Sequence, residues 1–124
     1  MLALRLASLF GFLAVALGAF GAHGLKKVVD PAMLHNWQTG ALYHLAHAVV
    51  LLAIALYILP ARGEKEKPRI PVAFWLFVTG ITLFSGSLYI YTLTGVKALA
   101  AITPFGGVFI LLGWLALAFL RRRE

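Results

Sequence analysis

Hydrophobic residues run along this chain in four long blocks that contain no charged side chain. The blocks cover residues 6–25, 31–61, 70–96 and 98–120, which are 20, 31, 27 and 23 residues long. Because a helix needs about 20 apolar residues to cross a bilayer, each block is long enough to span a membrane. The pattern predicts an all-α integral membrane four-helix bundle, a single domain over residues 1–124, with helices at about 6–25, 39–59, 72–93 and 104–120.

The first block also has features of a secretory signal, since Arg5 precedes an apolar stretch that ends near small residues at 19–22. Its 20 uncharged residues are more than the roughly 7–15 of a signal core. We therefore expect a first spanning helix rather than a cleaved signal.

Small residues recur on one side of this first helix. Gly11, Ala14, Gly18 and Gly21 are separated by steps of 3, 4 and 3 residues, which places them on one helical face. Such a face lets another helix approach closely, so we expect it to be a packing seam.

The second block starts with Asp30 and Pro31, which are favoured at the N-cap and at the first position of a helix. A helix over the whole block would exceed the roughly 30 Å hydrocarbon core. We therefore predict a separate interfacial segment at 31–38, with Trp37 as an interface anchor and Gly40 as a bend before the spanning part.

Thr103 and Pro104 repeat the same pattern inside the fourth block. The pair predicts a broken or kinked start to the last helix, and residues 97–102 then form either a separate short turn or the first part of a kinked helix. If Thr103 is an N-cap, the free N–H groups beside Gly106 and Gly107 form a site for a ligand oxygen, and if it is not, Thr-Pro is a plain kink.

Composition and charge agree with a membrane protein. The chain has 62% hydrophobic and 12% charged residues, with a net charge of +7. Most cations flank apolar blocks, where they set topology and attract lipid headgroups, so we expect membrane lipids and no nucleic acid as partners.

Four crossings put eight Lys and Arg residues on the side of both termini and the 60–71 loop, and three on the other. The positive-inside rule then predicts cytoplasmic termini and a cytoplasmic loop in a multi-pass membrane protein.

The most informative polar residues are His44 and His47, three residues apart in the second spanning segment and near the middle of the bilayer. Ionisable groups at that depth normally face the bundle interior, a partner or water. Four readings remain: hydrogen bonding between helices, a pocket for a small or lipid-like ligand, a metal or haem site, and proton conduction. We predict no catalytic residues, metal or cofactor, because two histidines are an incomplete ligand set and no carboxylate lies at membrane depth. The candidate ligand-binding residues are His44, His47, Tyr43, Ser85, Tyr89, Thr103 and His23.

The preferred reading is a non-enzymatic binding or accessory protein with an intramembrane pocket of His, Tyr, Ser and Thr side chains. The alternatives are a small-solute or proton transporter, acting alone or as a homo-oligomer, and a structural subunit of a larger membrane complex.

Several motifs occur in an order typical of one known family. They are GAFGAHGL (18–25), WQTGALYHLAHA (37–48), FSGSLY (84–89), ITPFGG (102–107) and LLGWL (111–115). The chain resembles the small four-helix membrane proteins of domain-of-unknown-function family 423 (DUF423). The resemblance implies a bacterial inner or plasma membrane protein and assigns no activity. It marks His23, Trp37, Tyr43, His44, His47, Ser85, Ser87, Tyr89, Thr103 and Pro104 as motif positions without giving any of them a chemical role.

Overall fold

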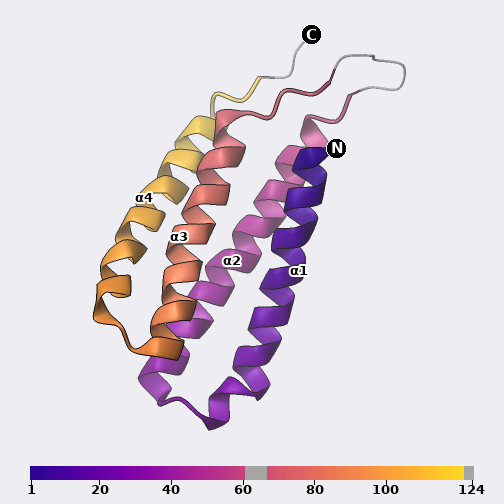
Figure 1. Ribbon diagram of the computed structural model, residues 1–124. Helices are drawn as coiled ribbons and strands as arrows, with labels where there is room; N and C mark the ends of the chain where they lie inside the picture. The colour runs from indigo at the N-terminus through magenta and orange to yellow at the C-terminus, as the bar shows by residue number, and fades with distance from the viewer. Residues whose placement is uncertain (61–66, 122–124) are drawn as a thin grey trace.

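Four long α-helices make up the described part of the structure (Figure 1). The computed structural model describes residues 1–60 and 67–121. In that part of the chain the helices are α1 (Leu2–His23), α2 (Pro31–Tyr57), α3 (Val72–Thr94) and α4 (Lys97–Leu117), with a 3-10 helix, η1 (Leu25–Lys27), after α1. Each α-helix is long and apolar enough to cross a membrane. The predicted all-α four-helix membrane bundle is confirmed.

Helix α2 is continuous, so residues 31–38 form its first turns and not a helix of their own, and their place at the membrane interface stays a prediction. Its start follows the sequence signal, since Asp30 is the N-cap and its carboxylate accepts a hydrogen bond of 2.8 Å from the Met33 N–H. The helix then passes through Gly40 without ending. A Cβ built at Gly40 would lie 3.3 Å from the Leu88 Cβ, so this glycine serves close packing against α3 rather than a bend.

The predicted role of Trp37 as an interface anchor is wrong. Trp37 is only 2% exposed. Its indole N–H donates a 2.8 Å hydrogen bond to the Leu17 carbonyl of α1, and its ring lies against Gly21 and Tyr89. Because both its apolar ring and its polar N–H are satisfied inside the protein, Trp37 joins α1 to α2 and α3.

Helix α4 begins at Lys97, seven residues before the predicted start, and continues through Pro104. Thr103 is therefore inside the helix and is not an N-cap, so the broken start and the N-terminal oxygen site predicted there are wrong. Proline is compatible with this because a helix accommodates it by local bending. The preceding helix ends at Gly95, which has φ 69° and donates its N–H to the Tyr91 carbonyl at 2.8 Å.

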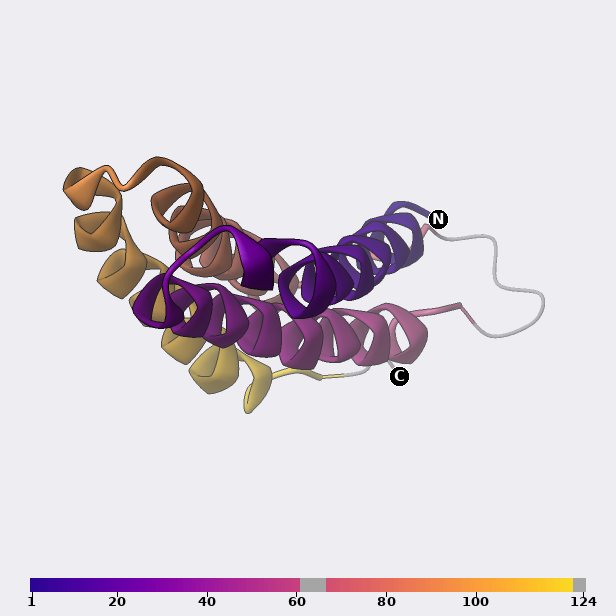
Figure 2. The same cartoon turned by 90° about the horizontal axis from the view of Figure 1, so that it is seen from below.

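The helices pack in chain order. Close backbone contacts join α1 to α2, α2 to α3 and α3 to α4 (Figures 1 and 2). The main core lies among α2, α3 and the inner sides of the outer helices, and consists of Ala3, Ala7, Leu51, Ile54, Ala55, Phe74, Phe77, Ile81 and Ile110. Helices α2 and α3 are thus central, while α1 and α4 expose broad apolar faces for lipid.

The predicted small-residue seam of α1 is only partly correct. Ala14 and Gly21 are buried, together with Ala3 and Ala7. Gly11 and Gly18 have open space where a Cβ would stand. The buried residues Ala7, Ala14 and Gly21 recur every seven positions and face α2, and Gly11 and Gly18 lie to the side of that line.

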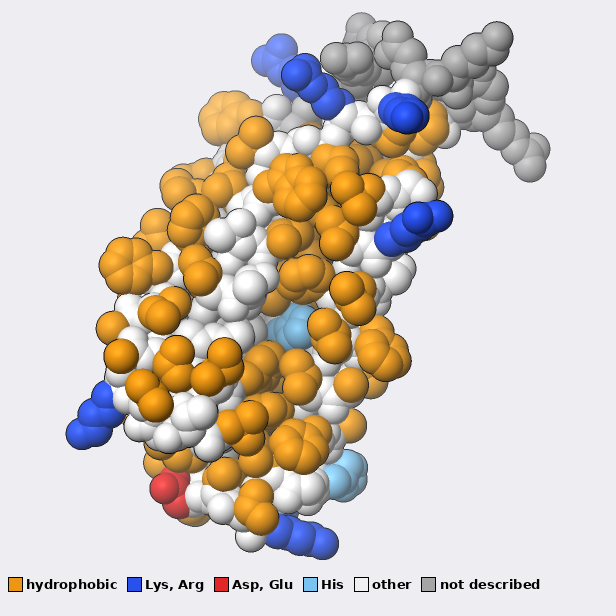
Figure 3. Space-filling view, in the orientation of Figure 1, with side chains coloured by type: hydrophobic (Ala, Val, Ile, Leu, Met, Phe, Trp, Pro, Cys, Tyr) orange, Lys and Arg blue, Asp and Glu red, His pale blue; other side chains and the backbone are white. Residues whose placement is uncertain are grey.

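Charged side chains lie at the two ends of the apolar body (Figure 3). The start of α1 and the end of α4 share one end of the molecule, as four crossings require (Figure 1). Residues 61–66 of the predicted cytoplasmic loop, and residues 122–124 with two of the counted arginines, lie outside the described residues. The cytoplasmic orientation of this end stays a prediction.

Candidate functional site

His44 lies in the interior where α1, α2 and α3 meet, and is 4% exposed. Its Nδ1 is 2.9 Å from the Tyr89 hydroxyl of α3. The Phe10 ring of α1 stands edge-on to the imidazole, with ring centroids 5.9 Å apart and an interplanar angle of 78°. Neighbouring helices therefore surround His44, as the sequence predicts.

The second ring nitrogen of His44 is not fully hydrogen-bonded. Nε2 is buried and makes no hydrogen bond of good geometry with the described residues, although the backbone of Phe10 lies close to the ring. The Tyr89 hydroxyl is hydrogen-bonded to His44. We assign the hydroxyl as the donor to Nδ1, because its hydrogen is then satisfied. A neutral imidazole then carries its hydrogen on Nε2. His44 consequently presents a buried N–H donor whose contact with the Phe10 backbone falls short of a full hydrogen bond.

His47 is bonded differently, on the side of α2 that meets α3 and α4. Its Nδ1 is 2.7 Å from the Tyr43 carbonyl, one turn earlier, and its Nε2 is 3.1 Å from the Trp114 indole nitrogen of α4. A carbonyl only accepts and an indole N–H only donates, so Nδ1 carries the hydrogen and Nε2 accepts. The Phe77 ring packs nearby, at 5.6 Å between centroids. His47 is a neutral imidazole with both nitrogens engaged.

Hydroxyl groups of α3 make two further contacts between helices. Ser85 is buried and donates a 2.7 Å hydrogen bond to the Gly40 carbonyl of α2. Ser87 and Thr103 of α4 are 2.6 Å apart through their hydroxyl oxygens. Hydroxyl groups of α3 therefore make hydrogen bonds with both of its neighbours, α2 and α4.

The candidate residues do not converge on one pocket. His44 pairs with Tyr89, whereas His47 contacts Tyr43 and Trp114. Tyr43 is itself 43% exposed. His23 is exposed at the far end of α1. The two histidines thus belong to two clusters on neighbouring sides of α2.

Sequence reasoning missed the aromatic partners Phe10 and Trp114. Both are aromatic residues in spanning helices far along the chain from His44 and His47. Spacing within one helix carries no information about which ring of another helix it meets. The LLGWL motif (111–115) is the feature of the sequence that singles out Trp114.

In residues 1–60 and 67–121, no group of three His, Cys, Asp or Glu side chains lies close enough together to hold a metal ion. The donor set around the two histidines consists instead of hydroxyl, indole and carbonyl groups. These groups suit hydrogen bonding to a neutral molecule better than metal coordination.

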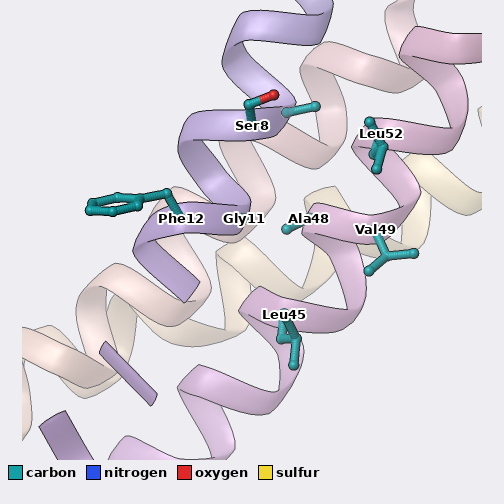
Figure 4. Close-up of a pocket in the computed structure, with 8 residues that line it drawn as sticks. Ser8, Gly11, Phe12, Leu45, Ala48, Val49 and Leu52 are labelled. Carbon is teal, nitrogen blue, oxygen red and sulfur yellow. The ribbon is translucent and has the colours of Figure 1, made fainter. Parts of the chain in front are cut away.

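A hollow of about 170 Å³ lies between α1 and α2 (Figure 4). From here on it is called the α1–α2 groove. Its lining includes Ser8, Gly11 and Phe12 of α1 and Leu45, Val49 and Leu52 of α2. In the close-up the Phe12 ring points away from α2, so the space beside Gly11 stays open. Apart from Ser8, the side chains that line it are apolar.

The model of the family described as "Protein of unknown function (DUF423)" matches residues 17–107. That range contains both histidine clusters except for Phe10 and Trp114. The chain belongs to the DUF423 family. The resemblance inferred from the motifs is thereby confirmed.

Relatives within this family match over most of their length. The UPF0382 membrane protein YwdK of Bacillus subtilis is 43% identical over 110 residues, which is 89% of this chain and 87% of the relative. A UPF0382 membrane protein of Haemophilus influenzae is 40% identical over 116 residues, which is 94% of this chain and 90% of the relative. A UPF0382 membrane protein of Schizosaccharomyces pombe is 35% identical over 116 residues, which is 89% of this chain and 92% of the relative. No solved structure matches the chain.

The relatives and the structure together establish the location of this DUF423 member. The relatives are named membrane proteins, and four helices here are long and apolar enough to cross a bilayer. The protein is therefore a multi-pass membrane protein.

Proposed function

We propose that this DUF423 member is a non-enzymatic membrane protein that binds a small lipid-like ligand through His44. The observation that carries the proposal is the buried Nε2 of His44, which makes no hydrogen bond of good geometry with the described residues. An unpaired polar group in hydrocarbon costs several kcal/mol because no water is available there. A ligand oxygen that accepts a hydrogen bond from Nε2 removes this cost.

The ligand class follows from the surroundings of the donor. Tyr89 occupies the other nitrogen of the ring and Phe10 covers its edge. The ligand therefore needs one acceptor oxygen, such as the carbonyl of an ester or a quinone-like ring, on an otherwise apolar body. It enters from the bilayer between α1 and α3, because α1 has close backbone contacts only with α2 and η1 in the described part of the chain. Rotation of Phe10 or a small shift of α1 opens this path.

A binding role is favoured over catalysis by the state of the second histidine. Both nitrogens of His47 are engaged by protein groups, so it cannot exchange a proton without losing one of these bonds. Asp30, the acidic residue within the described ranges, caps α2 at one end of the bundle. The interior thus offers a hydrogen-bond donor to a ligand and lacks the paired acid and base of general acid–base chemistry.

The test compares His44→Asn with His47→Asn. The Asn carbonyl retains an acceptor near the position of Nδ1 for the Tyr89 hydroxyl, and the substitution removes the Nε2 donor. Full-length protein is stripped of lipid, a total lipid extract of the host membrane is added back, and the rise in melting temperature is measured. We expect equal protection of the wild type and of His47→Asn, and a smaller rise in melting temperature for His44→Asn.

Native mass spectrometry of protein released from membranes adds a second readout. The wild type should retain a small molecule that His44→Asn lacks. If His44→Asn is protected as well as the wild type and retains the same molecule, the proposal is wrong. An equal loss of protection in both variants also contradicts it, because His47 has no free nitrogen to offer a ligand.

A further inference from the structure

The α1–α2 groove is open because Gly11, on its wall, has no side chain to fill the space. A Cβ built at Gly11 finds no atom within 4 Å, although Gly11 lies between Ser8 and Phe12 on the wall of the groove. The volume of about 170 Å³ is close to that of an apolar cavity of about 150 Å³ that stays dry and holds a small hydrocarbon. Because most of the lining is apolar, water gains few hydrogen bonds there. A hydrocarbon segment is the better occupant.

A cation stands at the end of this groove. Arg5 is exposed and precedes Ser8 by three residues, so it lies one turn closer to the N-terminal end of α1. It forms no ion pair within residues 1–60 and 67–121, where the acidic residue, Asp30, caps α2 at the opposite end. A long Arg side chain near a helix end extends toward the lipid headgroups while its stem stays in the apolar region.

We propose that Arg5 and the α1–α2 groove form a binding site for one anionic phospholipid. The guanidinium of Arg5 binds the phosphate in the bidentate geometry that suits this pair. One acyl chain runs from there past Ser8 and lies in the space beside Gly11, against Val49 of α2. Charge complementarity and the apolar hollow thus meet the two parts of a single lipid molecule.

This site is separate from the one proposed at His44. Phe10, not Gly11, contacts the His44 ring, and none of the groove residues is bonded to His44 or Tyr89. The two proposals therefore succeed or fail independently. His44→Asn is expected to leave anionic lipid binding unchanged.

The experiment is native mass spectrometry of the full-length protein titrated with phosphatidylglycerol or phosphatidylcholine of the same acyl chains. The wild type should favour phosphatidylglycerol about fivefold, the effect expected of one interfacial cation. Arg5→Gln should bind both lipids equally. Arg69→Gln, which neutralises an exposed cation at the same end of the molecule, should keep the preference.

Filling the groove tests the acyl-chain half of the proposal. Gly11→Leu should lower the binding of both lipids at least fivefold, whereas Gly18→Leu, on the same helix and also in open space, should bind both like the wild type. If Gly11→Leu does not fold, as judged by circular dichroism, Val49→Phe fills the groove from α2. Its control is Val15→Phe, because Val15 is similarly exposed and does not line the groove.

Three results overturn the proposal. Equal losses of preference in Arg5→Gln and Arg69→Gln mean diffuse attraction to the charged end. If Arg5→Gln keeps the preference for phosphatidylglycerol, Arg5 does not bind the phosphate. Wild-type binding by a folded groove-filling variant shows that no lipid chain occupies the groove.

Discussion

Replacing Gly106 by Ala should force α3 and α4 apart. A Cβ built at Gly106 would lie 2.7 Å from the Phe84 Cα and 2.8 Å from the Leu83 carbonyl carbon, whereas carbon atoms pack best at about 3.5–4.0 Å. Both neighbours are backbone atoms, so no side chain can rotate away. The helices must separate by nearly 1 Å, which disturbs the contacts of Ile110 in the core.

The adjacent Gly107 is a matched control. A Cβ there meets the Phe84 ring at 3.8 Å, an ordinary contact distance. Both substitutions gain the same helix propensity of about 1 kcal/mol, which cancels when the two variants are compared. The remaining difference is the overpacking term, typically about 1–3 kcal/mol and here at the upper end because backbone must move.

The assay is equilibrium unfolding of the full-length protein by a denaturing detergent, followed by circular dichroism. We expect Gly106→Ala to have a free energy of unfolding about 2–3 kcal/mol lower than Gly107→Ala. Gly107→Ala should equal or exceed the wild type. If the two variants unfold within about 0.5 kcal/mol of each other, the close backbone contact between α3 and α4 is not present in the folded protein.

Three smaller changes test individual hydrogen bonds by the same assay. Trp114→Phe keeps a ring but removes the donor to His47, so stability should fall by about 1 kcal/mol, and an additive loss in a double variant with His47→Leu would refute the pairing. Ser85→Ala should cost about 0.6–1.7 kcal/mol through loss of the bond to the Gly40 carbonyl, and a neutral effect would contradict that contact. Asp30→Ala should cost about 0.5–2 kcal/mol through loss of the cap, whereas Asp30→Asn should recover most of it.

Local sequence signals predicted the elements whose determinants lie within a few residues. The uncharged blocks gave four spanning helices, since only a helix satisfies its own backbone in lipid. Asp30 and Pro31 marked the start of α2, and α3 ends at Gly95, a residue type favoured after a helix. In each case the deciding interaction joins residues at most four positions apart.

The same local signals failed where a distant helix changes the outcome. Thr103 and Pro104 form a typical helix start, yet α4 begins at Lys97 and the Thr103 hydroxyl contacts Ser87 instead. Tryptophan is a residue type typical of interface anchors, but the indole N–H of Trp37 donates to a carbonyl of α1 inside the protein. These residues have two acceptable local roles, and packing selects one.

The sequence alone predicted that His44 and His47 lie inside the bundle, because imidazoles in hydrocarbon need polar partners and three-residue spacing places the two side chains on neighbouring sides of α2. Only the tertiary structure decided that these partners differ. The order in which α1, α3 and α4 surround α2 gives His47 two hydrogen bonds and leaves one nitrogen of His44 without one of good geometry. Helical periodicity fixes the direction of a side chain along its own helix, while the approach and rotation of neighbouring helices fix what it meets.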